Sequence, residues 1–95
     1  MIQILGKVQI EDLAKFISVF STRGAAQRAE HGSFGAQLFK IPSDESRVMV
    51  LFDWESREAF EAFRVDPATK AAMQASGTVG PPEFTFIEMV AEFPA

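Results

Sequence analysis

The chain has 95 residues and a hydrophobic fraction of 47%. That is enough for one modest core, so we expect residues 1–95 to form a single domain. The absence of cysteine excludes disulfides, thiol nucleophiles and thiolate metal sites. The formal net charge of −4 and the scattered positions of the Lys and Arg residues argue against nucleic acid or a membrane as a partner.

The first predicted element is a strand at the N-terminus. Ile2, Ile4 and Val8 alternate with more polar neighbours, which is typical of a strand. Residues 1–10 are too short and, with Lys7 near their middle, too polar for a signal peptide or a membrane span. We therefore predict a cytoplasmic protein.

A long helix is predicted next, over residues 13–31. Glu11 and Asp12 place negative charge where the N-terminus of a helix favours it. Gly32 would end the helix in the left-handed conformation, and Gly24 could break it midway. The predicted buried face repeats every three or four residues and consists of Leu13, Phe16, Ile17, Phe20 and Gly24.

Two strands follow and form a predicted hairpin. Residues 33–41 make one strand and residues 47–54 the other, and the polar residues 42–45 form the turn between them. The third predicted strand is apolar on both faces, with Val48, Val50, Phe52 and Trp54 on one face and Met49 and Leu51 on the other.

A second helical region is predicted between Ser56, a suitable N-cap, and a stop near Gly77. Within it, Asp66 followed by Pro67 would cap and restart the helix. The last predicted strand spans Glu83–Val90. The complete order, β-α-β-β-α-β, predicts an α+β, ferredoxin-like fold: a four-stranded antiparallel sheet with two helices on one face.

The apolar residues on both faces of the strands predict a homodimer. Two helices can cover only one face of the sheet, and the other face would be a larger apolar patch than monomers normally expose. The same face of a second copy is the simplest cover, because a two-fold contact pairs identical surfaces. The alternative is a monomer with an unusually apolar sheet.

Most of the chain resembles a known family. Residues 50–63, with the sequence Val-Leu-Phe-Asp-Trp-Glu-Ser-Arg-Glu-Ala-Phe-Glu-Ala-Phe, carry this resemblance together with residues 66–67, Gly77 and residues 80–86. They resemble the antibiotic-biosynthesis-monooxygenase-like group of the dimeric α/β-barrel superfamily. The resemblance implies two ferredoxin-like subunits packed sheet against sheet into a barrel, with a small-molecule pocket in each subunit.

The resemblance also implies a chemistry. The best-studied oxygenases of this family act on quinol- or anthrone-like aromatics without a metal or flavin, because the deprotonated substrate itself reduces O₂. Their pockets use Asn, Trp and Tyr, sometimes with His or Arg, whereas this chain has neither Asn nor Tyr. Only Trp54 matches, and we predict no cofactor and no metal.

Three residues are predicted as candidate catalytic groups. His31 is the only imidazole and could act as a general base, although a His in the last turn of a helix also interacts with the helix dipole. Trp54 could stack on a flat ligand or belong to the core. Glu88 could be a base with a raised pKa if it shares a buried strand face with Phe84 and Phe86. Otherwise the strand end emerges into water, or Glu88 pairs with a cation across the dimer.

Two functions therefore stay open from the sequence. The first is a cofactor-independent monooxygenase, or a related proton-transfer enzyme, acting on a small aromatic compound. The second is a non-catalytic homodimeric module that binds a small apolar metabolite or none. The ten Phe residues indicate that a pocket inside either protein would be apolar and aromatic.

Overall fold

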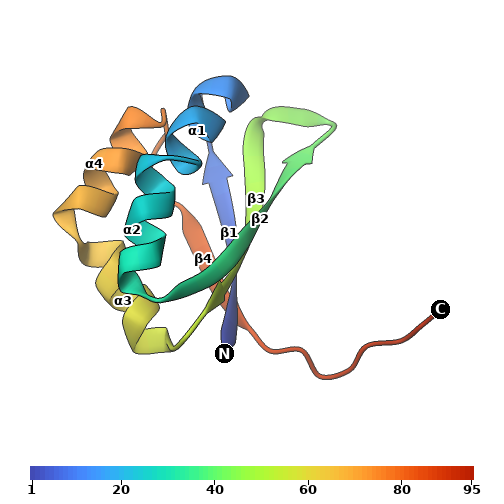
Figure 1. The fold of residues 1–95 in the computed structure, drawn as a ribbon. Coiled ribbons are helices and arrows are strands. Elements are labelled where there is room, and N and C mark those ends of the chain that lie inside the picture. Colours follow the sequence, from blue (N-terminus) through green and yellow to red (C-terminus); the bar gives the residue numbers. More distant parts are fainter.

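A computed structural model describes all residues from Met1 to Ala95 and has the predicted element order (Figure 1). Each predicted helical region forms two consecutive helices, so the α+β, ferredoxin-like arrangement contains four strands and four helices. The elements are β1 (Ile2–Gln9), α1 (Leu13–Phe20), α2 (Arg23–His31), β2 (Ser33–Ile41), β3 (Asp44–Trp54), α3 (Arg57–Val65), α4 (Pro67–Ala75) and β4 (Glu83–Ile87).

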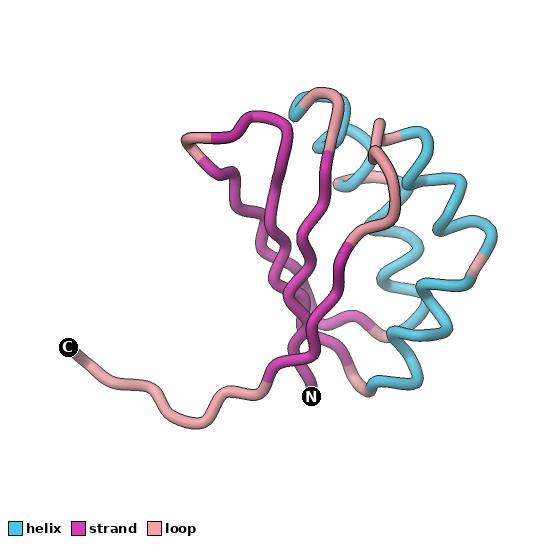
Figure 2. Tube along the Cα trace, turned by 180° about the vertical axis from the view of Figure 1, so that it is seen from behind, coloured by secondary structure: helices cyan, strands magenta, loops and turns pink.

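The four strands form one antiparallel sheet in the order β2-β3-β1-β4. At the centre of the sheet, Ile4 of β1 lies opposite Phe52 of β3 and Phe86 of β4. All four helices cover one face of this sheet, and the other face is left open (Figure 2). The predicted two-layer architecture is confirmed.

The first helical region breaks at Ser21 and Thr22, so the expectation of a break at Gly24 is wrong. The Ser21 and Thr22 hydroxyls donate hydrogen bonds to the carbonyls of Ile17 and Ser18, each at 2.7 Å. These hydroxyls satisfy the last carbonyls of α1 in place of a further helical turn. Gly24 lies inside α2 instead.

The other helix boundaries follow the predicted capping chemistry. Asp66 accepts a hydrogen bond from the Ala68 backbone N–H at 2.8 Å, with Pro67 at the first position of α4. Gly32 ends α2 with a φ of 102°, a left-handed conformation that favours glycine.

The last strand is shorter than predicted, because it ends at Ile87 and not at Val90. Its only neighbour in the sheet is β1, and Ile87 already lies opposite Gln3, near the beginning of β1. Residues beyond Ile87 therefore have almost no strand left to pair with. Residues 88–95 form an exposed tail that runs away from the body (Figure 2).

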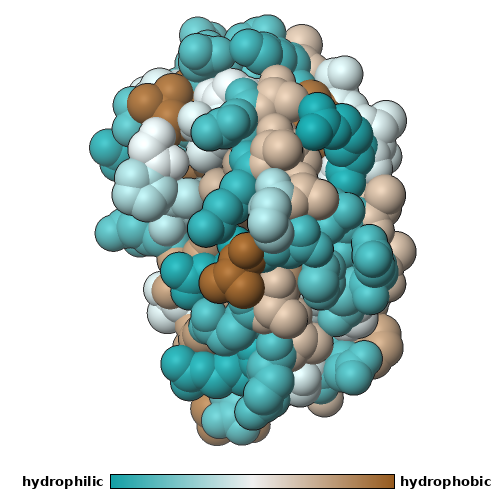
Figure 3. Space-filling view, turned by 90° about the vertical axis from the view of Figure 1, so that its left-hand side faces the viewer, coloured by the Kyte–Doolittle hydropathy of each residue, from teal (hydrophilic) through white to brown (hydrophobic).

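The core lies between the helices and the sheet. The side chains that fill it are Ile4, Val8, Ile10, Phe16, Val48, Val50, Phe52, Trp54, Phe60, Phe63 and Ala72. Outside the core, the helical side of the molecule is predominantly hydrophilic (Figure 3). No helix has the length and apolar character needed to cross a membrane.

The open face of the sheet carries apolar side chains that nothing in the chain covers. Leu5 and Leu51 lie opposite each other near its centre, and both remain partly exposed. Phe39 lies opposite Met49 and is 50% exposed, and Ile87 is 38% exposed. The prediction of apolar residues on both faces is confirmed for β3, while Phe34 lies at a β-bulge of β2 and Met89 and Val90 lie beyond β4.

Candidate ligand site

An apolar cavity lies between the helices and the covered face of the sheet. Its volume is about 70 Å³, several times the roughly 10–15 Å³ that one water molecule requires. Val50, Phe52 and Phe84 line it from the sheet, while Phe16 and Phe20 line it from α1. The lining suits a flat apolar group, but the volume is below the roughly 300–1,000 Å³ of typical ligand pockets.

Five polar residues border the cavity, from α2, α4 and the connection that follows α4, but the surface that faces the cavity is almost entirely apolar. Gln27 and Arg28 are consecutive residues of α2, and Thr69 belongs to α4. The Thr69 hydroxyl is buried and donates to the Gln27 side-chain carbonyl oxygen at 3.4 Å. No carboxylate and no imidazole lines the cavity.

Arg28 is the only charged residue that lines the cavity. Its guanidinium donates to the backbone carbonyl of Phe20 at 3.0 Å, and the guanidinium carbon lies 3.9 Å from the centre of the Phe20 ring. None of the four ion pairs of the chain includes Arg28. Burial lowers the pKa of Arg28 through desolvation, but a guanidinium remains charged at any physiological pH.

Gly24 makes room for this guanidinium. A Cβ atom at Gly24 would lie 3.1 Å from Nη1 of Arg28 and 3.3 Å from the Val19 carbonyl oxygen. Both distances are tighter than ordinary van der Waals contact, so a side chain at this position would push the arginine away. The missing side chain of Gly24 therefore helps to hold the guanidinium over the Phe20 ring.

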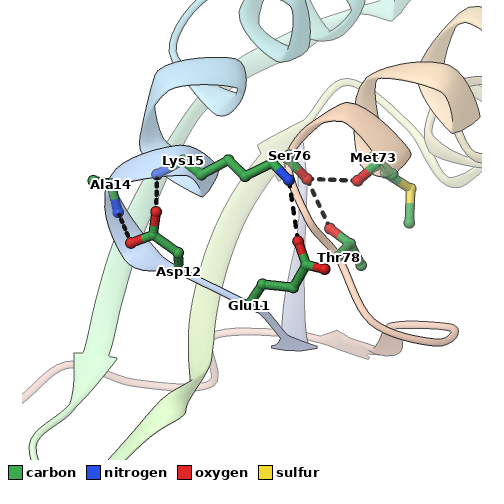
Figure 4. A network of polar contacts seen from close by, with 7 residues as sticks. All are labelled: Glu11, Asp12, Ala14, Lys15, Met73, Ser76 and Thr78. Atoms are coloured by element: carbon green, nitrogen blue, oxygen red, sulfur yellow. Dashed lines mark hydrogen bonds and ion pairs between the residues drawn. The ribbon is translucent and has the colours of Figure 1, made fainter.

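Hydroxyl groups after α4 hold one end of the cavity in place (Figure 4). Ser76 donates to the Met73 carbonyl at 2.6 Å, and the Ser76 and Thr78 hydroxyls lie 2.9 Å apart. Nearby, the Glu11 backbone N–H donates to the Gly77 carbonyl and ties this loop to the segment before α1. Both hydroxyls are thus engaged in structural hydrogen bonds.

His31 lies in the last turn of α2, as predicted, but it does not line the cavity. Its Nε2 atom is 2.8 Å from Oδ2 of Asp66, at the junction of α3 and α4. An ionised carboxylate only accepts hydrogen bonds, so the imidazole donates here. The bonds from His31 and from the Ala68 backbone N–H lower the pKa of Asp66.

Trp54 is completely buried, and it does not line the cavity. Its ring packs 4.9 Å from the ring of Phe63 and 5.4 Å from that of Phe60, measured between centroids. The indole N–H has no hydrogen-bond partner. Trp54 therefore occupies a core position, and Phe63 is its contact with the cavity lining.

Glu88 follows the last residue of β4 and is exposed. Phe84 and Phe86 point into the layer between the sheet and the helices, but the strand ends before it can place Glu88 beside them. The predicted site residues His31, Trp54 and Glu88 are therefore not brought together at the cavity. No group of three or more potential metal-ligating His, Cys, Asp or Glu side chains occurs elsewhere.

The sequence pattern indicates only some of the residues that line the cavity. Phe16, Phe20, Gly24 and Arg28 follow one another at intervals of four, so Arg28 continues the apolar face predicted for the first helix. The presence of Gly24 one turn before Arg28 on that face is the sequence feature that indicates space for the arginine side chain. Thr69 lies on another helix, and nothing local in the sequence connects it with Gln27.

Comparisons with known proteins agree with this architecture. The family model described as "Antibiotic biosynthesis monooxygenase" matches residues 1–75. No curated protein matches the chain in sequence at a significant level.

Several solved structures share the fold at low sequence identity. SnoaB, a cofactor-independent oxygenase from Streptomyces nogalater, is 17% identical with a TM-score of 0.76, over 99% of this chain and 97% of that one. A candidate antibiotic biosynthesis monooxygenase from Caulobacter crescentus is 23% identical with a TM-score of 0.74, over 95% and 90% of the two chains. Rv0793 from Mycobacterium tuberculosis is 15% identical with a TM-score of 0.67, over 96% of each chain.

Proposed function

Because the chain belongs to the antibiotic biosynthesis monooxygenase family, we propose that it is an oxygenase that oxidises a small aromatic compound without a metal or an organic cofactor. The observation that carries this proposal is the aromatic cavity between the helices and the sheet. SnoaB, which shares the fold, is a cofactor-independent oxygenase. The cavity volume of about 70 Å³ is about half that of a cavity known to hold benzene, roughly 150 Å³, so a single ring enters only if the lining side chains move and a fused tricycle does not fit.

The proposed reaction needs only the substrate and O₂. A deprotonated substrate gives one electron to O₂, and the two radicals combine to a peroxide. The peroxide forms at a ring carbon next to the phenolate carbon and loses water, so that the quinol and O₂ become a hydroxyquinone and H₂O. Since no carboxylate or imidazole lines the cavity, the substrate loses its proton to solvent.

We further propose that the active protein is a homodimer. The open face of the sheet carries Leu5, Phe39, Met49, Leu51 and Ile87 with no cover from the same chain. The same face of a second copy would remove these side chains from water. A cytoplasmic location stays a prediction from the sequence.

Filling the cavity is the experiment that tests the oxygenase. Ala72 is buried and lines the cavity, while its neighbour Ala71 is exposed and does not. Ala72→Met should reduce oxygen uptake with simple hydroquinones at least about tenfold, because the added side chain occupies the ligand space. Ala71→Met should leave the rate unchanged. Wild-type protein that consumes no oxygen with any of these quinols would contradict the proposal.

A binding module without turnover is the second candidate. It is favoured by the lining itself, which contains no acid or base that could take a proton from a ligand. A ligand that binds the wild-type protein, is displaced by Ala72→Met and yet is returned unchanged in the presence of O₂ would identify this function.

A further inference from the structure

We propose that the tail, residues 88–95, crosses to the second copy of the homodimer and adds a short strand to the free edge of that copy's β2. The inference rests on the proposed homodimer, and it concerns a separate contact that the tail makes beside the sheet faces. Because a two-fold contact is reciprocal, each copy would hold the other through an exchanged strand.

The tail has no partner within its own chain. Residues 88–95 belong to no helix or strand, and none of the backbone hydrogen bonds outside those elements involves them. Their large apolar side chains Met89, Val90 and Phe93 are each at least 65% exposed. Three such side chains close together indicate an interaction surface. The tail therefore lacks both backbone partners and a cover for its apolar side chains.

The tail leaves the body on the side where the second copy is expected. In both views of the backbone it runs out on the side of the sheet opposite the helices (Figure 1, Figure 2). A strand rises about 3.3 Å per residue, so residues 88–93 can span roughly 20 Å. Packed sheets lie about 10 Å apart. The tail can therefore cross to the partner and still pair with it over about three residues.

The alternation of side chains in the tail agrees with this path. Successive side chains of a strand point to opposite faces. Ile87 lies on the open face of the sheet, so in an extended continuation of β4 the side chains of Met89 and Phe93 follow on that same side. Glu88 and Glu92 then point to the other side. The apolar side chains of the tail would thus face the interior of the dimer.

The free edge of β2 offers the backbone partner that the tail lacks. β2 lies at one end of the sheet and pairs only with β3, so its outer edge has no strand beside it. Such an edge readily accepts a strand from another chain. On the open face of β2, Phe39 is half exposed, and Met89 or Phe93 of the tail would lie beside it. No proline precedes Pro94 in the tail, so residues 88–93 can all donate to the added ladder.

Charge favours the edge at β2 over the edge at β4. The tail carries two glutamates and no basic residue, whereas β2 carries Lys40 and no acidic residue. Lys40 is exposed and belongs to no ion pair. It lies opposite Val48, a core residue, so it is on the side of the sheet that the glutamates of the tail would also face. β4 is only five residues long and carries Glu83, which would repel the tail.

Cysteine cross-linking tests the exchange directly, because the chain has no cysteine of its own. Met89→Cys or Ala91→Cys protein is co-expressed with Gln37→Cys or Phe39→Cys protein, and the disulfides are identified by peptide mass spectrometry. We expect a disulfide between tail and β2 in at least one of the four combinations, because all four positions would lie on the same face of adjacent strands. Ala71→Cys, at an exposed position of α4, replaces the β2 variant as the control and should give none.

A substitution in the tail measures what the exchanged strand contributes. Phe93→Asp should raise the dissociation constant of the dimer at least about tenfold, measured by sedimentation, because it removes an apolar contact and buries an unpaired charge. Val65→Asp is the control, since Val65 is exposed at the end of α3 and should leave the dimer unchanged. The tail contacts nothing in its own chain, so Phe93→Asp should leave the fold intact.

The outcomes separate the exchanged strand from the proposed homodimer. A dimer without any disulfide from tail to β2, or one whose dissociation constant is unchanged in Phe93→Asp, would overturn the exchange and retain the homodimer. A disulfide that forms within one doubly substituted chain diluted in excess wild type would also overturn it, because the tail would then fold back over its own sheet. A wild-type monomer at micromolar concentration would overturn both proposals.

Discussion

At the scale of single residues, the contact between His31 and Asp66 joins parts of the chain that are 35 positions apart. The other three ion pairs connect residues that are three or four positions apart in the sequence. Asp66 also caps α4, so one carboxylate ties the end of α2 to the start of α4. His31 therefore acts in this structure as a link between helices.

Replacing His31 should change the titration of Asp66. The pKa of Asp66 is lowered first by the bond from His31 and then by the Ala68 backbone N–H. His31→Ala should raise this pKa towards its usual value, measured by NMR titration of the side-chain carboxyl group. Asp44 is the internal control, because Ser46 lowers its pKa and His31 does not contact it.

The lowered pKa of Asp66 also determines how the stability contributed by the His31–Asp66 contact depends on pH. A carboxyl with a lowered folded-state pKa stabilises the fold above its unfolded-state pKa of about 3.9. This stabilisation is lost as the pH falls through the lower folded-state value. The unfolding free energies of wild type and His31→Ala should therefore converge as the solution is acidified below about pH 4. A difference that grows on acidification would contradict the role assigned to this contact.

At the scale of elements, the two helix starts at Ser56 and Thr22 have different chemistry. The Ser56 hydroxyl accepts a hydrogen bond from the Ala59 backbone N–H at 3.1 Å and caps α3. Thr22 precedes α2 but makes no side-chain capping bond, because its hydroxyl donates backwards to α1. Residue type alone would rank both as good N-caps.

This difference gives a prediction for the stability of α3. Ser56→Ala should lower the free energy of unfolding by about 1 kcal/mol, the usual cost of a lost cap. Thr22→Ala should cost clearly less, because no N-capping bond is lost and water can replace the exposed hydrogen bond from the Thr22 hydroxyl to the Ser18 carbonyl. Urea unfolding followed by circular dichroism measures both. Equal losses in the two variants would show that the capping bond at Ser56 does not contribute as described.

At the scale of the whole molecule, the unequal faces of the sheet determine the expected assembly. One face is covered by four helices, and the other exposes a row of apolar side chains that includes Phe39 and Ile87. The outside of the helical layer is mostly hydrophilic, with only scattered apolar patches (Figure 3). A second copy is therefore expected on the sheet and not on the helices.

A charge on the open face should separate the two copies. Leu51 lies on this face at the centre of the sheet, so Leu51→Glu would bury two unpaired carboxylates in a sheet-to-sheet contact. We expect the dissociation constant to rise more than about 100-fold, since each buried charge costs several kcal/mol. Val65→Glu is the control, because Val65 is exposed at the end of α3. Sedimentation of a wild-type monomer at micromolar concentration would contradict the dimer.

The sequence by itself determined the order of the elements, both helix caps of the second region and the two apolar faces of β3. These features depend on neighbours a few positions away, so periodicity and capping chemistry are sufficient to predict them. The break in the first helical region occurs at Ser21 and Thr22 and not at Gly24, because the two hydroxyls bind the last carbonyls of α1. The end of β4 was missed because it depends on where β1 begins.

Only the tertiary structure decided which side chains share the cavity. His31, Trp54 and Glu88 were selected for their chemical type, but type does not specify what lies opposite a residue in the fold. Thr69 contacts Gln27, which is 42 positions away in the sequence. Whether a carboxylate lies near Arg28 likewise depends on every residue that packs around it. Such contacts arise from the packing of α2 and α4 on the sheet, and no local pattern encodes them.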